Sequence, residues 1–232
     1  MTSIGNSWAL KVETLFGAYH KPDVFENKEL ILFNKDLAKE INIDFDNFDE
    51  KEICDILLGY KLLNKDFFSQ AYAGHQFGQF TILGDGRALI LGEHITKNNQ
   101  RYDIQLKGSG KTPYSRQGDG RAALGPVLRE YIISEAMFGL GVPTTRCLAV
   151  VKTGEDVVRE RPLPGAVLTR VASSYIRVGT FQYLASKKDI SGLKKLVDYT
   201  INRHFISLKN SENPALALLK AVIKKQIELK LL

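Results

Sequence analysis

Three glycine-containing turns surround Lys107 in the sequence, and no other part of the chain restricts its possible folds as strongly. The turns are Gly84-Asp85-Gly86-Arg87, Gly108-Ser109-Gly110-Lys111 and Gly118-Asp119-Gly120-Arg121. Glycine lets a backbone turn tightly and approach a ligand closely, while backbone N–H groups and basic side chains attract anions. The pattern therefore predicts a binding site for a nucleotide polyphosphate.

The first turn is predicted to join two strands. Residues 80–83 and 88–91 are short apolar segments on either side of it and predict a β-hairpin, and residues 102–107 predict a third strand. The chain has no GxxxxGK[ST] P-loop, and a dinucleotide-binding turn would open a helix. A GxG in a hairpin is also typical of a simple tight turn. A glycine loop between strands, followed by a lysine on a later strand, is typical of protein kinases, in which a helix glutamate pairs with that lysine.

A helix is predicted over residues 122–140 and offers two glutamates as partners for Lys107. Glu130 faces away from the apolar stripe of that helix, whereas Glu135 lies on the stripe and is the alternative. A buried lysine without a carboxylate tends to lose its proton, so a pair would preserve the charge that a phosphate needs. In the competing interpretation, Lys107 and Glu130 are simply solvated residues.

The remaining pattern has strands first and helices afterwards, which predicts an α+β domain. Residues 148–151 and 166–171 are predicted as a strand pair joined by a charged loop over residues 153–164. Before the glycine turns we expect helices near residues 30–41, capped by Asn34 or Asp36, and near residues 53–63. After the strand pair, helices are predicted over residues 181–185, 191–205 and 214–232.

Composition excludes several classes of protein. The 32 Lys and Arg exceed the 26 Asp and Glu, but many of the lysines have the spacing of solvated helix faces. A nucleic-acid-binding protein would be expected to interleave basic residues with aromatic ones, and the sequence contains no such run. Cys54 and Cys147 form no CxxC motif, so we expect buried thiols and not a zinc site. His75 is expected to be structural and not a general base. The sequence shows no leader peptide and no run that could span a bilayer, so we expect a cytoplasmic protein.

Several segments together closely resemble the selenoprotein O family of protein adenylyltransferases, also described as pseudokinases. These segments are Tyr72-Ala73-Gly74-His75-Gln76-Phe77-Gly78, Leu83-Gly84-Asp85-Gly86-Arg87, Gln105-Leu106-Lys107-Gly108-Ser109-Gly110-Lys111, Gly118-Asp119-Gly120-Arg121-Ala122-Ala123-Leu124 and Thr169-Arg170-Val171-Ala172-Ser173-Ser174. The resemblance implies a protein-kinase-like fold, with an antiparallel sheet and helices in the N-lobe and the start of a C-lobe. It also implies an enzyme that binds ATP and transfers AMP to Ser, Thr or Tyr hydroxyls of proteins.

The family's site residues can be carried over by position. The resemblance implies that the nucleotide contacts Gly84, Gly86, Arg87, Lys107, Asp119, Gly120, Arg170 and Arg177. It implies further that Glu130 pairs with Lys107 and that Mg²⁺ or Mn²⁺ accompanies the ATP.

The chain departs from the family at its C-terminus. The family's catalytic aspartate and metal ligands would lie beyond Leu232, so we expect no catalytic or metal residue within this chain and a missing C-terminal half as a possible partner. We therefore expect an N-terminal lobe over residues 1–180 and the start of a helical lobe over residues 181–232, from a bacterial cytoplasmic protein. The alternative is an inactive nucleotide-binding module or fragment.

Overall fold

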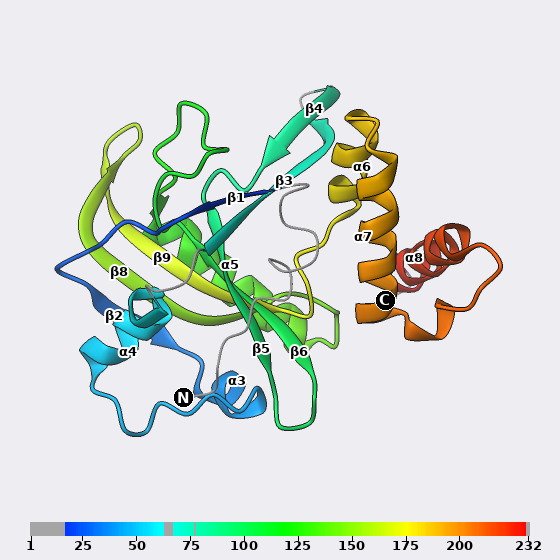
Figure 1. The fold of residues 1–232 in the computed structure, drawn as a ribbon. Coiled ribbons are helices and arrows are strands. Elements are labelled where there is room, and N and C mark those ends of the chain that lie inside the picture. The colour runs from blue at the N-terminus through cyan, green and yellow to red at the C-terminus, as the bar shows by residue number, and fades with distance from the viewer. Residues whose placement is uncertain (1–16, 63–66, 77, 231–232) are drawn as a thin grey trace.

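The computed structural model describes residues 17–62, 67–76 and 78–230. Its centre is a nine-stranded sheet in the order β1-β3-β5-β6-β9-β8-β2, with β4 on β3 and β7 on β9 (Figure 1). Every strand pair is antiparallel. The strands are β1 (Gly17–His20), β2 (Glu29–Phe33), β3 (Phe67–Gln76), β4 (Gln79–Gly84), β5 (Ala88–Ile95), β6 (Arg101–Lys107), β7 (Ala122–Ala123), β8 (Arg146–Val158) and β9 (Pro162–Ala172).

Helices cover both faces of this sheet. The helices are α3 (Lys35–Glu40), α4 (Glu50–Leu57), α5 (Leu124–Gly139), α6 (Val178–Ser186), α7 (Ile190–His204) and α8 (Pro214–Lys230), with short 3₁₀ turns at Tyr60–Leu62 and Ile206–Leu208. In Figure 1, α6, α7 and α8 stand together at one side of the sheet, away from α3 and α4. The α+β prediction is confirmed, as are the predicted helices over residues 122–140, 181–185 and 191–205 and the strand at 102–107. The predicted helices near residues 53–63 and over residues 214–232 are confirmed as far as Leu62 and Lys230, since residues 63, 231 and 232 lie outside the described residues.

Alternation of side chains along the strands separates two faces. On one face, Leu106 and Val167 belong to a core that includes Leu37 of α3 and Cys54 of α4. The opposite face carries two smaller cores, one formed with Val127 of α5 and one with Leu184 of α6 and Tyr199 of α7. Because side chains alternate along a strand, Gln105 and Lys107 must point to the face that carries α5 and α6.

The predicted hairpin around Gly84-Asp85-Gly86-Arg87 is wrong. The segments β4 and β5 do not pair with each other, because β4 pairs with β3 from Ala71↔Gly84 to Gln76↔Gln79 and β5 meets β3 at Phe68↔Ile90. The hairpin partner of β4 is β3. The glycine turn therefore joins two segments that both run antiparallel to β3, and it is not the tip of a hairpin.

Two further expectations are corrected. Residues 30–33 form strand β2, paired with β8, and the helix begins only at Lys35, after Asn34 caps it by accepting from the Leu37 N–H. A short apolar run does not distinguish helix from strand by periodicity alone. The predicted loop over residues 153–164 is mostly strand, because β8 and β9 continue to Val158 and from Pro162 as a long ribbon. Its charged residues, Glu155, Asp156, Arg159, Glu160 and Arg161, are exposed along an extended hairpin.

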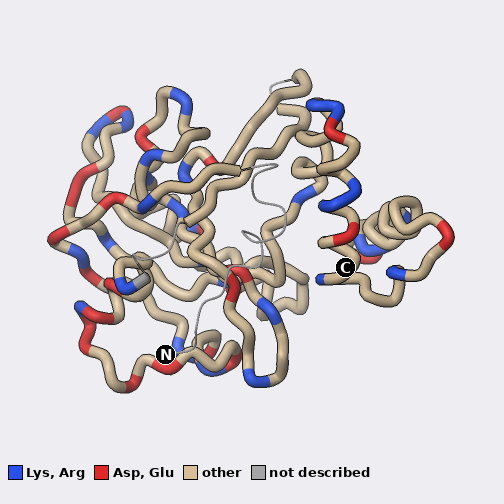
Figure 2. The backbone as a smooth tube through the Cα atoms, in the orientation of Figure 1, with Lys and Arg blue, Asp and Glu red and all other residues tan. Residues whose placement is uncertain are grey.

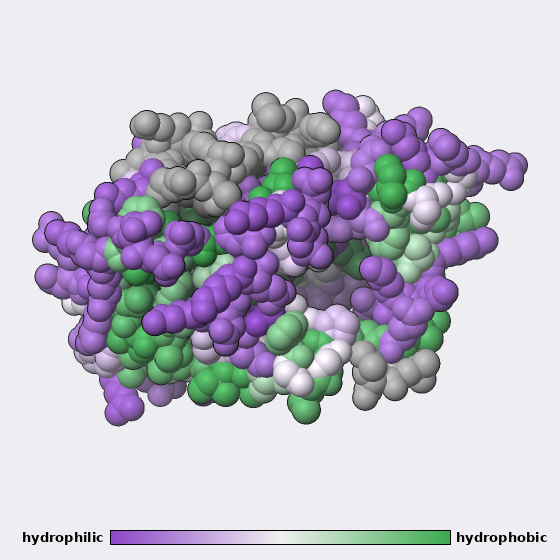
Figure 3. Space-filling view, turned by 90° about the horizontal axis from the view of Figure 1, so that it is seen from below, coloured by the Kyte–Doolittle hydropathy of each residue, from purple (hydrophilic) through white to green (hydrophobic). Residues whose placement is uncertain are grey.

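The last helix, α8, exposes much of its apolar stripe. Leu216, Leu219, Ile223 and Ile227 are each between 45% and 55% exposed, and Leu218 alone is buried. Figure 3 shows green apolar surface among the purple on the side of the molecule where Figure 1 places α8. The predicted lobe boundary at residue 180 falls inside α6, so the division into two lobes stays a prediction. None of the described helices has the length and apolarity needed to cross a bilayer.

Candidate nucleotide site

A cavity of about 690 Å³ opens on the face of the sheet that carries α5 and α6. All eight residues that the resemblance assigns to nucleotide contact line it: Gly84, Gly86, Arg87, Lys107, Asp119, Gly120, Arg170 and Arg177. They come from β4, β6, β9, two glycine turns and the start of α6. The two glycine turns therefore open toward one cavity and not toward opposite faces. Its volume lies within the usual range for small-molecule sites, roughly 300–1,000 Å³.

Lys107 and Glu130 form an ion pair at the edge of this cavity. The ammonium of Lys107 contacts Oε2 of Glu130, and Nη1 of Arg170 donates to Oε1 of the same carboxylate at 2.9 Å. Burial opposes the charge of Glu130, but the hydrogen bond from Lys107 and the charge of Arg170 hold the pKa of that carboxyl below its usual value. Glu130 thus fixes two cations that line the cavity.

The alternative partner, Glu135, belongs to another contact. Its carboxylate accepts from Nε and Nη2 of Arg146, at 3.0 Å and 2.8 Å, and from the backbone N–H of Cys147 at 2.9 Å. The side chain of Asn34 also donates to it. Glu135 therefore anchors α5 to β8 and does not reach Lys107.

The two arginines of the resemblance reach the cavity from different directions. Arg170 lies on β9, and its side chain points to the cavity face of the sheet because side chains alternate along a strand. Its Nη2 also contacts the side chain of Gln105 on β6. Arg177 is the N-cap residue of α6, and the bend after β9 turns its side chain back toward the sheet. There its guanidinium lies over the Tyr72 ring, 4.6 Å from the centroid, and contacts Asp85 at 3.3 Å.

Asp119 lines the cavity, but its carboxylate is engaged by an arginine that the sequence analysis did not single out. Arg159, at the tip of the β8–β9 ribbon, donates to both oxygens of Asp119 at 2.7 Å and 3.0 Å. The hydrogen bond from Arg159 lowers the pKa of Asp119. Arg121, two residues along, pairs with Asp23 and Glu155. These contacts fasten the third glycine turn to the ribbon, and only the fold reveals them, since Arg159 lies in a segment predicted as a loop.

Close packing of the backbone requires glycine at Gly86 and Gly120, whether or not a ligand also approaches them. A Cβ on Gly86 would lie 2.9 Å from the carbonyl oxygen of Tyr114. Gly120 has φ +68°, and a Cβ there would lie 1.9 Å from the carbonyl oxygen of Gly110. The tight-turn and ligand-approach interpretations are thus compatible at these positions, because the turns pack against one another to form the cavity wall.

Positive and negative side chains mix over most of the molecule, as Figure 2 shows along the chain. Within the cavity the balance of charge is more positive, since Arg87 is exposed and no described carboxylate pairs with it. Arg170 and Arg177 each keep a buried Nε without a hydrogen-bond partner. Buried donors normally have partners, so these two nitrogens are exceptions.

No metal site is evident among the described residues, where no three His, Cys, Asp or Glu side chains could hold an ion. The carboxylates near the cavity are already paired with cations: Glu130 with Lys107 and Arg170, Asp119 with Arg159, and Asp85 with Arg177. His75 does not line the cavity, and its ring meets Phe80 edge-on at 5.6 Å.

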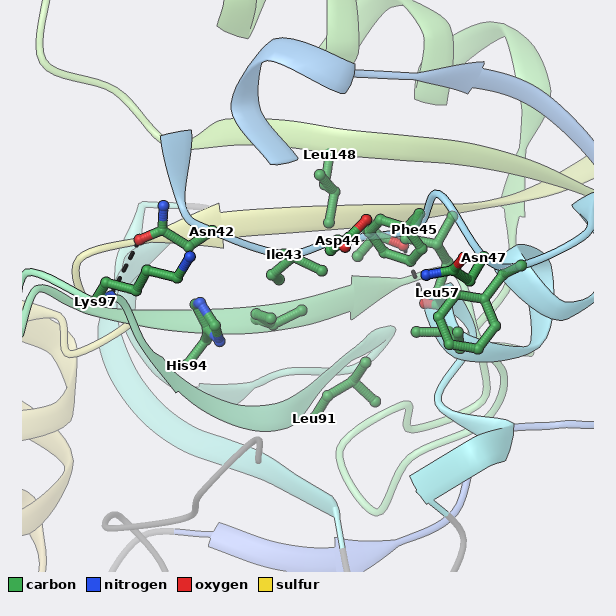
Figure 4. Close-up of a pocket in the computed structure, with 14 residues that line it drawn as sticks. Asn42, Ile43, Asp44, Phe45, Asn47, Leu57, Leu91, His94, Lys97 and Leu148 are labelled. Atoms are coloured by element: carbon green, nitrogen blue, oxygen red, sulfur yellow. Dashed lines mark hydrogen bonds between the residues drawn. The ribbon is translucent and has the colours of Figure 1, made fainter. Parts of the chain in front are cut away.

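A second cavity, of about 380 Å³, lies on the opposite face of the sheet under the segment 42–48 (Figure 4). Its lining is mainly apolar and includes Ile43, Leu91 and Leu148. The His94 ring forms part of its wall and contacts the carbonyl oxygen of Ile41 at 2.5 Å through Nε2. None of the residues that the sequence analysis assigned to nucleotide contact lines it. We assign it no role.

Comparison with known proteins agrees with these features. Residues 9–230 match the family described as protein adenylyltransferase SelO. A protein named protein nucleotidyltransferase YdiU from Pelagibacter ubique is 58% identical over 202 residues, covering 87% of this chain and 42% of that protein. Proteins of the same name from Brevibacillus brevis and Clostridium botulinum are 55% and 54% identical over 97% and 98% of this chain, and 46% of each is covered. The chain spans less than half the length of these curated relatives.

Proposed function

The chain belongs to the SelO family of protein adenylyltransferases, and we propose that it binds ATP in the cavity beside Lys107 for transfer of AMP to protein hydroxyls. The names of its relatives support a nucleotidyltransferase activity. The identity of the nucleotide, the choice of Ser, Thr or Tyr as acceptor and a location in the bacterial cytoplasm belong to the proposal. Because the relatives are about twice as long, the activity of the whole protein is also proposed and not observed.

One observation carries the proposal: six cationic side chains line the cavity, and four of them are residues that the resemblance assigns to nucleotide contact. Lys107, Arg170 and Arg177 are each held by a carboxylate, whereas Arg87 has none among the described residues. Fixed donors that surround a phosphate stabilise it without having to reorganise when it binds. Guanidinium groups also match phosphate oxygens in geometry and can donate two parallel hydrogen bonds.

The backbone supports the same assignment. Gly84, Gly86 and Gly120 line the cavity without side chains of their own, so a polyphosphate can approach the main chain there. Two turns carry these glycines. Thr112 fastens the first by donating to the carbonyl oxygen of Asp85, and the pair between Asp119 and Arg159 fastens the second. The wall is therefore formed by main chain that is already packed in place.

Mg²⁺ or Mn²⁺ is expected from the resemblance, but the described carboxylates do not form a site for it. Each carboxylate near the cavity is committed to an arginine or lysine, so we derive no metal-dependent step from this part of the chain. A divalent ion would neutralise phosphate oxygens in nucleotidyl transfer. Its ligands, like a general base, are proposed to lie outside the residues described.

The second candidate is a nucleotide-binding module that does not catalyse transfer. The pairing of every cavity carboxylate with a cation favours it for this chain alone, since none is free to act as a base. The two candidates share the ATP site and differ in whether AMP is transferred once ATP has bound. A nucleic-acid-binding role, which the net charge of +6 could suggest, lacks a matching basic face.

Calorimetric titration with ATP, adenosine and a duplex oligonucleotide tests the proposal. ATP should bind more tightly than adenosine, and its affinity should fall as salt is raised, because the phosphates supply the difference. Incubation with α-labelled ATP, Mg²⁺ or Mn²⁺ and an acceptor protein then separates the two candidates. Labelled acceptor supports AMP transfer, whereas ATP binding without label supports the module. Equal affinity for ATP and adenosine, or tighter binding of the oligonucleotide, would overturn the assignment.

A further inference from the structure

We propose that Asp85 is a positioning residue that holds the guanidinium of Arg177 toward the phosphates of the bound nucleotide. This inference rests on the proposed function and extends it to a residue that contacts no ligand itself. It follows from the burial of Asp85, from its place in the first glycine turn, and from the way in which Arg177 is held.

Asp85 is the buried residue of an otherwise accessible turn. Its side chain is 2% exposed, whereas Gly86 is partly exposed and Arg87 is exposed. Asp85 is among the residues that line the cavity, but a carboxylate with so little accessible surface offers a ligand there almost no contact area. Burying a charge is costly unless a partner compensates for it, so the carboxylate is expected to have a specific structural task.

The turn itself holds this carboxylate in place. The backbone N–H of Asp85 donates to the carbonyl oxygen of Gln70 at 2.8 Å, and the backbone N–H of Gln70 donates to Oδ2 of Asp85 at 3.1 Å. The hydroxyl of Thr112 donates to the carbonyl oxygen of Asp85 at 2.8 Å. With Oδ2 bound to the sheet, Oδ1 is the oxygen that faces Arg177.

Arg177 is held from two sides. Its Nη2 donates to Oδ1 of Asp85 at 3.3 Å, and its guanidinium plane lies over the Tyr72 ring. Asp85 is its one side-chain hydrogen-bond partner among the described residues, and the Arg177 side chain is 39% exposed. A free arginine side chain loses rotamer entropy when it is fixed. Contact with Asp85 and Tyr72 lowers that cost before the nucleotide arrives.

The partner does not use up the donors of Arg177. A guanidinium has five N–H groups, of which the Nε–H of Arg177 is buried, and the single contact with Asp85 leaves the other terminal N–H groups for phosphate oxygens. Arg170 differs, because Glu130 and Gln105 take both of its terminal nitrogens and its side chain is only 14% exposed. Of the two arginines, Arg177 is therefore the one with accessible donors, and Asp85 determines where they point.

Titration of Asp85 offers a second readout. Burial raises the pKa of Asp85 to about 6, while Arg177, the Gln70 N–H and Arg170 oppose this effect. Tyr72 and Tyr114 also lie near the carboxyl. Near neutral pH the carboxylate is charged and holds Arg177. Below about pH 6 it gains a proton and its attraction for the guanidinium weakens.

The test is a double-mutant cycle on nucleotide affinity, with Asp85→Asn, Arg177→Gln and the combined variant. Asp85→Asn should weaken ATP binding about tenfold, as expected for one lost charge-assisted contact, and leave adenosine binding unchanged. Because Asp85 acts through Arg177, the combined variant should bind ATP no more weakly than Arg177→Gln alone. Asp103→Asn is the matched control, since Asp103 is an equally buried carboxylate paired with Arg203 and does not line the cavity. It should lower stability without a selective loss of ATP affinity.

Other outcomes are decisive as well. Two results would show that Asp85 supports the fold and does not act through Arg177. One is that the losses of ATP affinity in the two single variants multiply in the combined variant, and the other is that Asp85→Asn weakens ATP and adenosine binding equally. If Asp85→Asn does not fold, the ATP affinities of wild type and Arg177→Gln are compared at about pH 8 and about pH 5. Wild type should lose more affinity on acidification, and equal losses would overturn the inference.

Failure of the proposed function is distinguishable from failure of this inference. If wild type binds no ATP, the proposed function is wrong, and the relation between the two residues is then read from the NMR signal of the Arg177 Nε–H group. Asp85→Asn, or acidification below about pH 6 where that variant does not fold, should move this signal toward its value in a mobile side chain. An unchanged signal would show that Asp85 does not position Arg177.

Discussion

Lys107 on β6 and Glu130 on α5 form an ion pair across the junction of sheet and helix, although 23 positions separate them in the chain. The same carboxylate holds Arg170 of β9. Three elements thus meet at one side chain, and the position of α5 against the sheet determines where two cavity cations lie. This arrangement makes Glu130 the side chain whose removal tests both the packing and the site.

Glu130→Gln should destabilise the fold and weaken ATP binding together. The substitution leaves two cations sharing a neutral amide, and the expected loss is about 1–3 kcal/mol after allowing for the partial exposure of the site. Urea denaturation measures the stability and calorimetry measures the affinity. Glu135→Gln is the matched control on the same helix, because it removes a similar pair with Arg146 outside the cavity. A loss of ATP affinity in both variants, or in neither, would contradict the assignment of Glu130.

Gly120→Ala should be strongly destabilising, whereas Gly125→Ala should be neutral or stabilising. Gly120 has φ +68° and no room for a Cβ beside Gly110, while a Cβ on Gly125 would meet nothing within 4 Å. Gly125 lies in the first turn of α5, where alanine is preferred by about 0.5–1 kcal/mol. The comparison is made by thermal denaturation. Similar melting temperatures for Gly120→Ala and wild type would mean that the third glycine turn does not pack as described.

The two cysteines should not react with a thiol reagent in the native protein. Cys54 is 1% exposed and Cys147 is fully buried, and burial raises the pKa of each thiol to about 11. The thiolate is the reactive form, so both accessibility and ionisation oppose labelling. Labelling with an aromatic disulfide should be slow without denaturant and should become fast at the unfolding transition. Rapid labelling of one thiol in the native state would show that its core opens locally.

Much of the site could be predicted because its residues follow one another in a local order of strand, turn and helix. A lysine at the end of a strand and two glutamates on the next helix predicted a contact of Lys107 with Glu130 or with Glu135. The family resemblance, and not helix periodicity alone, decided for Glu130. Such predictions succeed because they depend on short-range geometry.

The errors have a common physical origin in pairing between distant strands. The segment 30–33 is a strand because β8 offers it a partner more than a hundred positions away, and β4 pairs with β3 and not with β5. Arg159 and Asp85 were missed for the same reason: their partners, Asp119 and Arg177, are brought to them only by the folded sheet. Local sequence pattern does not contain this information.

Acidification should destabilise the protein through His204, at the end of α7. Burial, followed by the charges of Arg203, Lys225 and Arg101, lowers the pKa of His204 to about 4. Above its ordinary pKa of 6.5 the imidazole is neutral in the folded and unfolded states, so it contributes no pH dependence there. As the pH falls from 6.5 toward about 4, the unfolded chain binds a proton that the folded chain does not, and stability decreases.

Between about pH 7.5 and about pH 4.5, the free energy of unfolding should therefore fall on the order of 1–2 kcal/mol more in wild type than in His204→Gln, after discounting for solvent screening. Urea denaturation at the two pH values measures the difference. Asp85 and Asp103, whose raised pKa values act in the opposite direction, are present in both proteins and cancel in the comparison. His75→Gln serves as the control for a histidine substitution at an exposed position on β3. Equal losses in wild type and His204→Gln would mean that protonation of His204 does not disfavour the folded state.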